Sequence, residues 1–393
     1  MPTVPSLVTL VLLIHALAAS AFAAPYIPKN GSQVVERLPA RTDPAQRELA
    51  RLRAELGQNP SDPARASSLA RRYIEMARAD GDPRYLGYAE AALAPWWNLP
   101  QPPDEVLVLR ATLRQSTHQF PAALADLDAA VARDSGNAQA WLTRATVLSI
   151  TGDFAAARAS CMRLQSRAPA LVVQTCLSSV DSGSGKARAG YTALQQALAQ
   201  AAPADPGIRI WTITLLAEMA TRLGDDRDAE AYFRQALAYD GADSYLLAAY
   251  ADFLLDHNRA PEVVRLLADK TRADALLLRY ALALRATKAP EAARHIGVLQ
   301  SRFEAAMLRG DTVHQREQAR FELSLRDNPA AGVRLARLNW AVQKEPADLR
   351  ILADAAAASG DAEAARLVHA WIKQSGIEDR TIAPALALLK AKA

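Results

Sequence analysis

The sequence predicts an all-α protein in which antiparallel helix pairs stack side by side into an α-solenoid. Ala, Leu and Arg are abundant in the 393 residues and aromatic residues make up only 6%, so residues with strong helix propensity dominate. No run alternates Val, Ile, Thr and aromatic residues with polar ones, as a half-buried strand would. A pattern of small and aromatic residues also returns roughly every 34 residues, a period typical of helical repeats.

The charge of the chain argues against a nucleic-acid partner. The 46 Lys and Arg residues are nearly matched by 42 Asp and Glu residues, which gives a formal net charge of +4. Both signs are spread along the sequence rather than gathered into a basic patch or stripe. We therefore expect a solvated, mixed-charge surface and no binding of nucleic acid.

The first 23 residues are predicted to be a cleaved signal peptide. An apolar run from Leu7 to Ala19 has the length of a signal-peptide core, and Ala21-Phe22-Ala23 resembles a small-x-small cleavage site. The mature chain would then be exported, to the periplasm or the medium of a bacterium, and would not be an integral membrane protein. The alternative is an uncleaved N-terminal membrane anchor, because Val4 to Ala24 approaches the length that spans a bilayer.

An extended arm and a first group of helices are predicted to follow. Residues 24–43 contain Pro, Gly and Asn without helical periodicity, which indicates an extended arm. Asp43-Pro44 then has the pattern of a helix cap followed by a proline at the first helical position. Residues 44–103 are expected to hold N-terminal helices with one degenerate repeat.

The repeat is clearest between residues 104 and 243. When the two stretches that start near Val106 and Ala140 are aligned, Ala111 matches Ala145, Phe120 matches Phe154 and Ala123 matches Ala157, and Leu127 falls on Cys161. A further copy carries Ala217, Gly224, Ala229, Phe233 and Ala236 at the same offsets. Each unit is expected to be two amphipathic helices joined by a tight turn, with small residues where the helices cross. Because one such hairpin cannot bury its own apolar face, the units must stack.

These residues resemble the tetratricopeptide repeat (TPR) family. Trp141, Ala145, Gly152, Phe154, Ala157 and Pro169 match its signature, as do Ala217, Gly224, Ala229, Phe233 and Ala236. The match is weakest over 244–347, although a further copy carries Ala353, Gly360 and Ala365. Residues 244–376 are interpreted as divergent TPR-like helix pairs, and residues 377–393 as a C-terminal capping segment. About nine helix pairs are expected from roughly residue 62 to residue 376.

No sequence motif predicts catalysis, a metal site or a cofactor. Ser182 to Gly190 contains Gly-Lys, but Val180 stands where a phosphate-binding loop needs Gly and Ala187 replaces its hydroxyl residue. We interpret this stretch as a turn between two helices of one repeat. The six histidines are scattered, and no Cys/His cluster has the spacing of a zinc site. The chain is therefore expected not to be an enzyme.

Two adjacent tryptophans, Trp96 and Trp97, precede a Pro-rich break. The simpler interpretation is that they seal the junction between the first helices and the better-matched repeats. The alternative is an exposed ligand contact, because tryptophan is favoured in binding hot spots.

The TPR resemblance implies a right-handed superhelix whose concave groove is lined by the first helix of each unit and holds an extended peptide or a partner helix. The positions that fall on this groove by register are Gln115, Leu142, Thr146, Trp211, Glu218, Arg222, Tyr245 and Asp252. The alternative is that this face is unused and that Trp211 and Tyr245 are ordinary packing residues. The clamp that some TPR domains use for C-terminal carboxylates is not expected, because its positions here hold Val108, Thr112, Leu142 and Thr146.

The only two cysteines are Cys161 and Cys176. In the TPR arrangement, Cys161 lies on a second helix and Cys176 on the first helix of the next unit, and such helices are neighbours. If the chain is exported to an oxidising compartment, a Cys161–Cys176 disulfide is predicted to join the two repeats. The alternative is a pair of buried thiols that pack as small apolar residues.

These features predict a non-catalytic scaffold or adaptor of the bacterial cell envelope that binds a peptide or partner protein in its groove. The alternative function is a constitutive structural subunit of an envelope export or assembly complex, docked through its convex face and residues 244–347. The first hypothesis favours a monomer and the second a hetero-complex.

Overall fold

The computed structural model describes residue 30 and residues 43–202, 205–239, 241 and 243–392. The predicted signal peptide and nearly all of the predicted arm lie outside these described residues. The chain divides into two compact units, Met1–Ala50 and Arg51–Ala393. Helix α2 (Pro44–Gln58) begins in the first unit and ends in the second. All that follows concerns the second unit.

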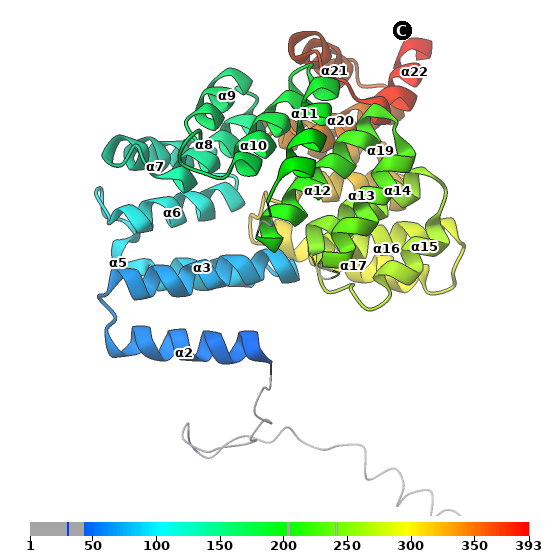
Figure 1. Cartoon of the computed structure of the whole chain (residues 1–393). Helices are drawn as coiled ribbons and strands as arrows, with labels where there is room; N and C mark the ends of the chain where they lie inside the picture. The colour runs from blue at the N-terminus through cyan, green and yellow to red at the C-terminus, as the bar shows by residue number, and fades with distance from the viewer. Residues whose placement is uncertain (1–29, 31–42, 203–204, 240, 242, 393) are drawn as a thin grey trace, which may run out of the picture. The chain divides into compact units, whose positions relative to one another are not determined.

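The second unit is built from consecutive helix pairs (Figure 1). In chain order the pairs are α3 (Pro63–Asp80) and α4 (Arg84–Ala92), α6 (Asp104–Ser116) and α7 (Phe120–Arg133), α8 (Ala138–Thr151) and α9 (Phe154–Met162), α10 (Ala170–Gly183) and α11 (Ala187–Gln200), α12 (Pro206–Leu223) and α13 (Asp226–Tyr239), α14 (Ser244–Asp256) and α15 (Ala260–Leu267), α16 (Asp274–Ala286) and α17 (Ala292–Leu308), α18 (Gln315–Leu325) and α19 (Pro329–Val342), and α20 (Pro346–Ser359) and α21 (Ala362–Ser375). The short helix α5 (Ala94–Trp97) follows α4, and η2 (Arg380–Ile382) and α22 (Ala383–Lys392) follow α21.

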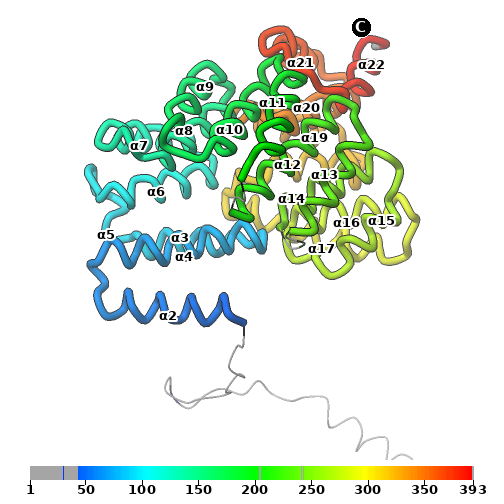
Figure 2. The backbone as a smooth tube through the Cα atoms, viewed as in Figure 1, coloured from blue at the N-terminus to red at the C-terminus, as the bar shows by residue number. Residues whose placement is uncertain are grey.

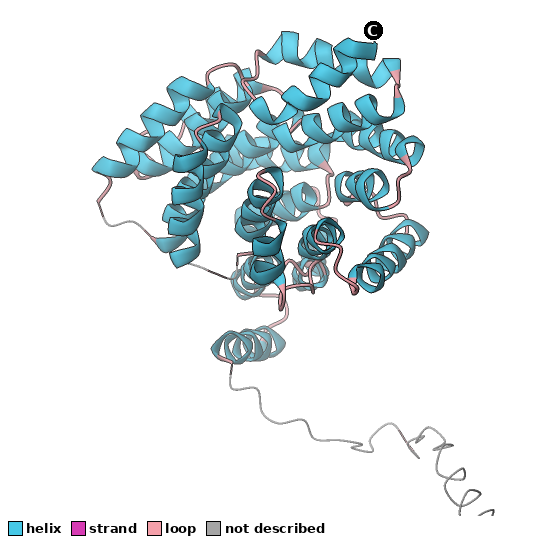
Figure 3. Ribbon diagram, turned by 90° about the vertical axis from the view of Figure 1, so that its right-hand side faces the viewer, coloured by secondary structure: helices cyan, strands magenta, loops and turns pink. Residues whose placement is uncertain are grey.

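This architecture confirms the predicted all-α solenoid. The two helices of each pair pack against each other, and the first helices of successive pairs are also in contact. Figure 3 shows helices and loops, without a strand, in the part of the chain that is described. The pair that begins at Asp104 buries an apolar stripe through residues such as Leu107. The pair that begins at Pro346 buries the same kind of stripe through residues such as Leu352.

The Gly-Asp turns form because the glycine ends one helix and the aspartate caps the next. Gly152 ends α8 with φ +90°, a left-handed conformation that residues with a Cβ rarely adopt. The Asp153 carboxylate then accepts a hydrogen bond from the backbone N–H of Ala156 at 3.0 Å and caps α9. Ala145 and Ala157 are fully buried where α8 and α9 cross, as the repeat pattern predicted.

A disulfide joins α9 to α10. The Sγ atoms of Cys161 and Cys176 are bonded, and their Cα atoms lie 5.7 Å apart. Both residues belong to an apolar cluster, with Leu148, Leu164 and Val180, that fills the junction of the two repeats. Helix α9 has 9 residues, whereas α11 and α13 have 14, so the disulfide fastens a short second helix to its neighbour.

Loss of this disulfide is expected to destabilise the protein by about 3 kcal/mol, because the bond restricts the unfolded chain across a loop of 15 residues. Denaturant unfolding of the wild-type protein with and without reductant measures the loss. The double variant Cys161→Ala and Cys176→Ala is the control, since reductant should leave its stability unchanged. Equal stability of the oxidised and reduced wild-type protein would contradict the prediction.

Successive turns of the solenoid touch each other (Figure 2). At one contact the Ser244 hydroxyl at the start of α14 donates to the Ala79 carbonyl of α3 at 2.9 Å. At another, the Lys344 backbone N–H donates to the Ile150 carbonyl at 2.7 Å, and the Trp371 ring lies directly against Gly152. Residues roughly six repeats apart are therefore held together, and the first helices of the later repeats face a common interior.

Candidate ligand pocket

A cavity of about 450 Å³ lies among the first helices of the later repeats. Helices α12, α14, α16, α18 and α20 contribute to its wall, and the segment around η2, which packs against α12 and α20, contributes the rest. Five arginines and six carboxylates line it: Arg222, Arg279, Arg316, Arg320, Arg350, Glu218, Asp252, Asp256, Glu317, Asp354 and Asp379. We call this space the charged pocket.

The helical period places these side chains on one face. Asp252 and Asp256 stand four residues apart on α14, as do Arg316 and Arg320 on α18 and Arg350 and Asp354 on α20. Residues at this spacing are neighbours on a helix surface. Since the other faces of each first helix are covered by its partner and by the adjacent first helices, the charged face is left to line the pocket.

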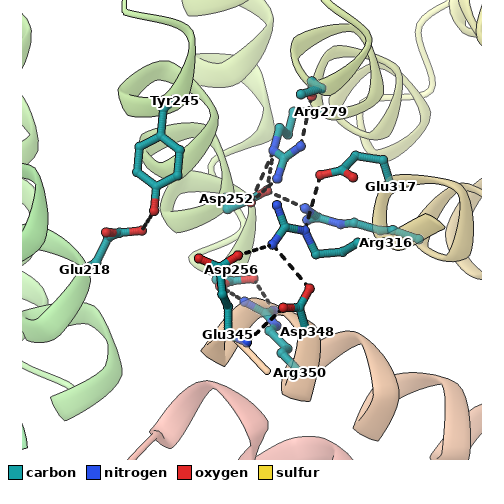
Figure 4. Close-up of polar contacts among 12 residues, drawn as sticks. Glu218, Tyr245, Asp252, Asp256, Arg279, Arg316, Glu317, Glu345, Asp348 and Arg350 are labelled. Atoms are coloured by element: carbon teal, nitrogen blue, oxygen red, sulfur yellow. Dashed lines mark hydrogen bonds and ion pairs between the residues drawn. The ribbon is translucent and has the colours of Figure 1, made fainter. Parts of the chain in front are cut away.

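Asp252 is the centre of an ion-pair cluster. It contacts Arg279 at 2.7 Å and Arg320 at 2.5 Å, so three helices meet at one carboxylate (Figure 4). Burial acts to raise the pKa of Asp252, but the two guanidinium groups outweigh it and hold the pKa well below its ordinary value. Asp252 is therefore a permanent anion that fixes Arg279 and Arg320.

Arg350 is held in the same way by the neighbouring carboxylate of α14. Its two Nη atoms donate to the two carboxylate oxygens of Asp256 at 2.6 and 2.7 Å. This fork-to-fork geometry is the strongest that a guanidinium and a carboxylate can form. It ties α20 to α14.

Arg316 joins α18 to the start of α20. Its guanidinium lies 3.3 Å from Glu317, 3.2 Å from Glu345 and 3.3 Å from Asp348. Asp348 is fully buried and also accepts hydrogen bonds from Asn339, Gln343 and the Glu345 backbone N–H, at 2.8, 2.9 and 2.9 Å. Figure 4 shows Glu345 and Asp348 converging on Arg316 from below. This polar network holds Arg316, which lines the pocket, in place.

Three lining carboxylates have no arginine within hydrogen-bond distance in the described residues. Glu218 accepts from the Tyr245 hydroxyl at 2.7 Å, and Asp379 accepts from the backbone N–H of Thr381 at 2.8 Å and from its hydroxyl at 2.7 Å. Asp354 lies 3.9 Å from Nε of Arg350. Burial raises the pKa of each of these three carboxyls. Burial and the adjacent Asp348 also raise the pKa of Glu345, to about 7.

The structure gathers half of the residues assigned to the groove from sequence. Glu218, Arg222 and Asp252 line the charged pocket, and Tyr245, whose side chain is 57% exposed, bonds to Glu218.

The other four residues assigned to the groove lie elsewhere. Leu142 and Trp211 are half-buried against the apolar cluster that contains Cys161. Gln115 on α6 and the exposed Thr146 on α8 are not part of the pocket wall.

Sequence reasoning missed Arg279, Arg316, Arg320 and Arg350. The first three belong to the stretch where the repeat signature is weakest, 244–347, and Arg350 lies just before the copy that carries Ala353 and Gly360. A signal was nevertheless present. Charged residues spaced by four interrupt otherwise apolar helices, as Asp252 and Asp256 do in α14, whose first three turns are nearly all apolar. Charges placed in that way indicate a polar surface enclosed by protein.

Two other sequence interpretations can be followed in the structure. The stretch 182–190 is a turn between helices, because α10 ends at Gly183 and α11 begins at Ala187. Trp96 is buried, and Trp97 stacks on Arg114 at 5.7 Å, which places the tryptophan pair at the junction before α6.

The described residues hold neither a cluster of metal-binding side chains nor a helix that could span a membrane. No three His, Cys, Asp or Glu side chains converge as metal ligands there. None of the helices described is both long and apolar enough to cross a bilayer.

Comparisons with known proteins found similarity of structure only. No protein-family model matches the chain, and no curated protein sequence does. Similar solved structures include a tetratricopeptide repeat protein from Parabacteroides merdae, at 16% identity and TM-score 0.39, covering 59% of this chain and 92% of that one. The human IFIT1 dimer with m7Gppp-AAAA has 13% identity and TM-score 0.47, with 88% and 86% covered. Yeast Tom70 has 11% identity and TM-score 0.36, with 88% and 91% covered. The helix pairs and Gly-Asp turns of the chain itself are what make it TPR-like.

Proposed function

We propose that this protein is a non-catalytic interaction scaffold of the bacterial cell envelope that binds an extended segment of a partner protein in the charged pocket. One observation carries the proposal: a cavity of about 450 Å³ whose charged wall comes from the first helices of five successive repeats. Fixed carboxylates and guanidinium groups can bond to the backbone and the side chains of a peptide.

Two features support a place in the cell envelope. The N-terminal sequence has the apolar core and the small-x-small site of a signal peptide. The Cys161–Cys176 disulfide is of a kind that persists in oxidising compartments such as the periplasm.

The composition of the pocket favours binding over catalysis. Its wall has arginines, carboxylates and a few hydroxyl groups, and no His or Cys is among its lining residues. Asp252 and Asp256 are engaged by arginines, so they are not available as general bases.

Site-specific photocrosslinking in cells tests the proposal. A photoreactive phenylalanine at Ser324, an exposed lining residue, is expected to capture a discrete partner. The same residue at Met307, which is 51% exposed on α17 and is not part of the pocket wall, should not capture it. Tyr245→Ala should reduce capture at Ser324. Capture from Met307 alone would favour a structural subunit docked through an outer surface, and no capture at either position would contradict the proposal.

A further inference from the structure

The side chains that line the pocket include more carboxylates than arginines. Its lining has six carboxylates for five arginines. A cavity lined by an excess of one charge concentrates ligands of the opposite charge. The excess therefore points to a cation.

The arginines are poorly placed to receive an anion. Arg279 and Arg320 are engaged by Asp252, Arg350 by Asp256 and Arg316 by three carboxylates. An anionic ligand would have to displace these partners while lying beside their carboxylates, and uncompensated charge in such an environment is strongly unfavourable. Among the lining arginines only Arg222 lacks a carboxylate partner in the described residues, and it donates to the Ser182 hydroxyl.

The carboxylates that accept no hydrogen bond from an arginine are, in contrast, ready to receive a cation; Asp354 among them keeps only a long contact of 3.9 Å with Nε of Arg350. Glu218 lies on α12, Asp354 on α20 and Asp379 just before η2, and η2 packs against both of these helices. The three carboxylates thus belong to adjoining parts of one wall. Glu218 and Asp379 keep oxygen lone pairs free after their hydrogen bonds to Tyr245 and Thr381, and these can accept charge-assisted hydrogen bonds, as can the carboxylate oxygens of Asp354.

We propose that the charged pocket selects a basic segment, in which lysine or arginine side chains bind Glu218, Asp354 and Asp379. This inference rests on the proposed function and adds the charge class of the partner. The paired arginines then act as a fixed frame that holds Asp252 and Asp256, and Glu218, Asp354 and Asp379 make the contacts. A free polyamine offers the same cationic groups without a peptide backbone.

Calorimetric titration of the full-length protein tests the inference with three probes: hexalysine, hexaglutamate and spermidine. Hexalysine is expected to bind, with its affinity reduced at least tenfold by the triple variant Glu218→Gln, Asp354→Asn and Asp379→Asn. The control triple variant Glu105→Gln, Asp269→Asn and Glu304→Gln removes the same charge from exposed positions outside the pocket wall, and should change the affinity less than twofold. Circular dichroism and thermal unfolding establish that both variants are folded. If the pocket triple variant is not folded, Glu218→Gln alone replaces it, with a threefold loss expected.

Each other outcome overturns a defined part of the proposal. Preferential binding of hexaglutamate would overturn the cationic class and leave the peptide-binding function standing. Spermidine binding as tightly as hexalysine would replace the basic segment by a small polyamine. Equal losses in the two triple variants would show that long-range attraction, not the pocket, binds the probe. If no probe binds but Ser324 still captures a partner in cells, the inference fails and the proposed function stands.

Discussion

Replacing Asp348 with alanine is expected to lower the free energy of unfolding by about 3–5 kcal/mol, the range measured when one partner of a buried ion pair is removed. Asp348 is fully buried at the start of α20 and accepts from Asn339, Gln343 and the Glu345 backbone while contacting Arg316. Alanine would leave the Asn339 amide and the Glu345 backbone N–H without this acceptor and would weaken the hold on Gln343 and Arg316, and a buried donor without a partner costs the full penalty of its lost hydration.

The neutral variant Asp348→Asn separates the loss of the negative charge from the loss of the whole side chain. Asp348→Asn preserves the volume and one carbonyl acceptor, so its loss should be smaller than that of Asp348→Ala. Asp269→Ala, at a side chain that is 81% exposed, should change stability by less than about 0.5 kcal/mol. Denaturant unfolding measures all three variants. A loss below 1 kcal/mol for Asp348→Ala would mean that the network does not hold the start of α20.

Replacing Trp371 with alanine is expected to cost about 3–5 kcal/mol, as for other large aromatic side chains in a core. The ring is only 8% exposed and packs edge-to-face on Trp340 at 5.4 Å and against Phe154 at 6.0 Å. It also covers Gly152, where an added Cβ would lie 2.5 Å from the ring. This side chain therefore holds one turn of the solenoid against the next, and its loss should weaken that contact as well as the core.

Hydrogen exchange distinguishes the effect of Trp371→Ala on the contact between turns from its effect on the core. The Lys344 amide, which donates to the Ile150 carbonyl, should lose protection in Trp371→Ala, whereas amides within α6 and α7 should be unchanged. Leu308→Ala, at a side chain that is 90% exposed, is the matched control and should alter neither exchange nor stability. Unchanged protection of Lys344 would show that the turns stay together without the tryptophan.

Contact between turns explains why this solenoid has a pocket rather than an open groove. The partners of the pocket's ion pairs are far apart in sequence, since Arg320 and Asp252 are separated by 68 residues and Arg350 and Asp256 by 94. Such pairs form only when the later repeats curve around a common interior.

The helix pairs could be read from the sequence because local chemistry specifies them. The 3.6-residue period, the left-handed glycine at Gly152 and the capping carboxylate at Asp153 each act within a few residues. Pairing of Cys161 with Cys176 followed from the same register, because neighbouring repeats repeat one geometry. Glu218, Arg222 and Asp252 were placed on the inner face for that reason.

The pocket itself was decided by the tertiary structure. Much of its charge comes from Arg279, Arg316 and Arg320, in repeats whose signature is weakest, from Arg350 on α20, and from Asp379, beyond the last helix pair. Small rotations between successive repeats accumulate along the solenoid, and the repeat signature does not encode their sum. The sequence by itself therefore determined the all-α architecture of stacked helix pairs and put Glu218, Arg222 and Asp252 on the face that lines the pocket. Only the three-dimensional structure decided which inward faces meet, because that depends on contacts between residues roughly six repeats apart, such as Gly152 and Trp371.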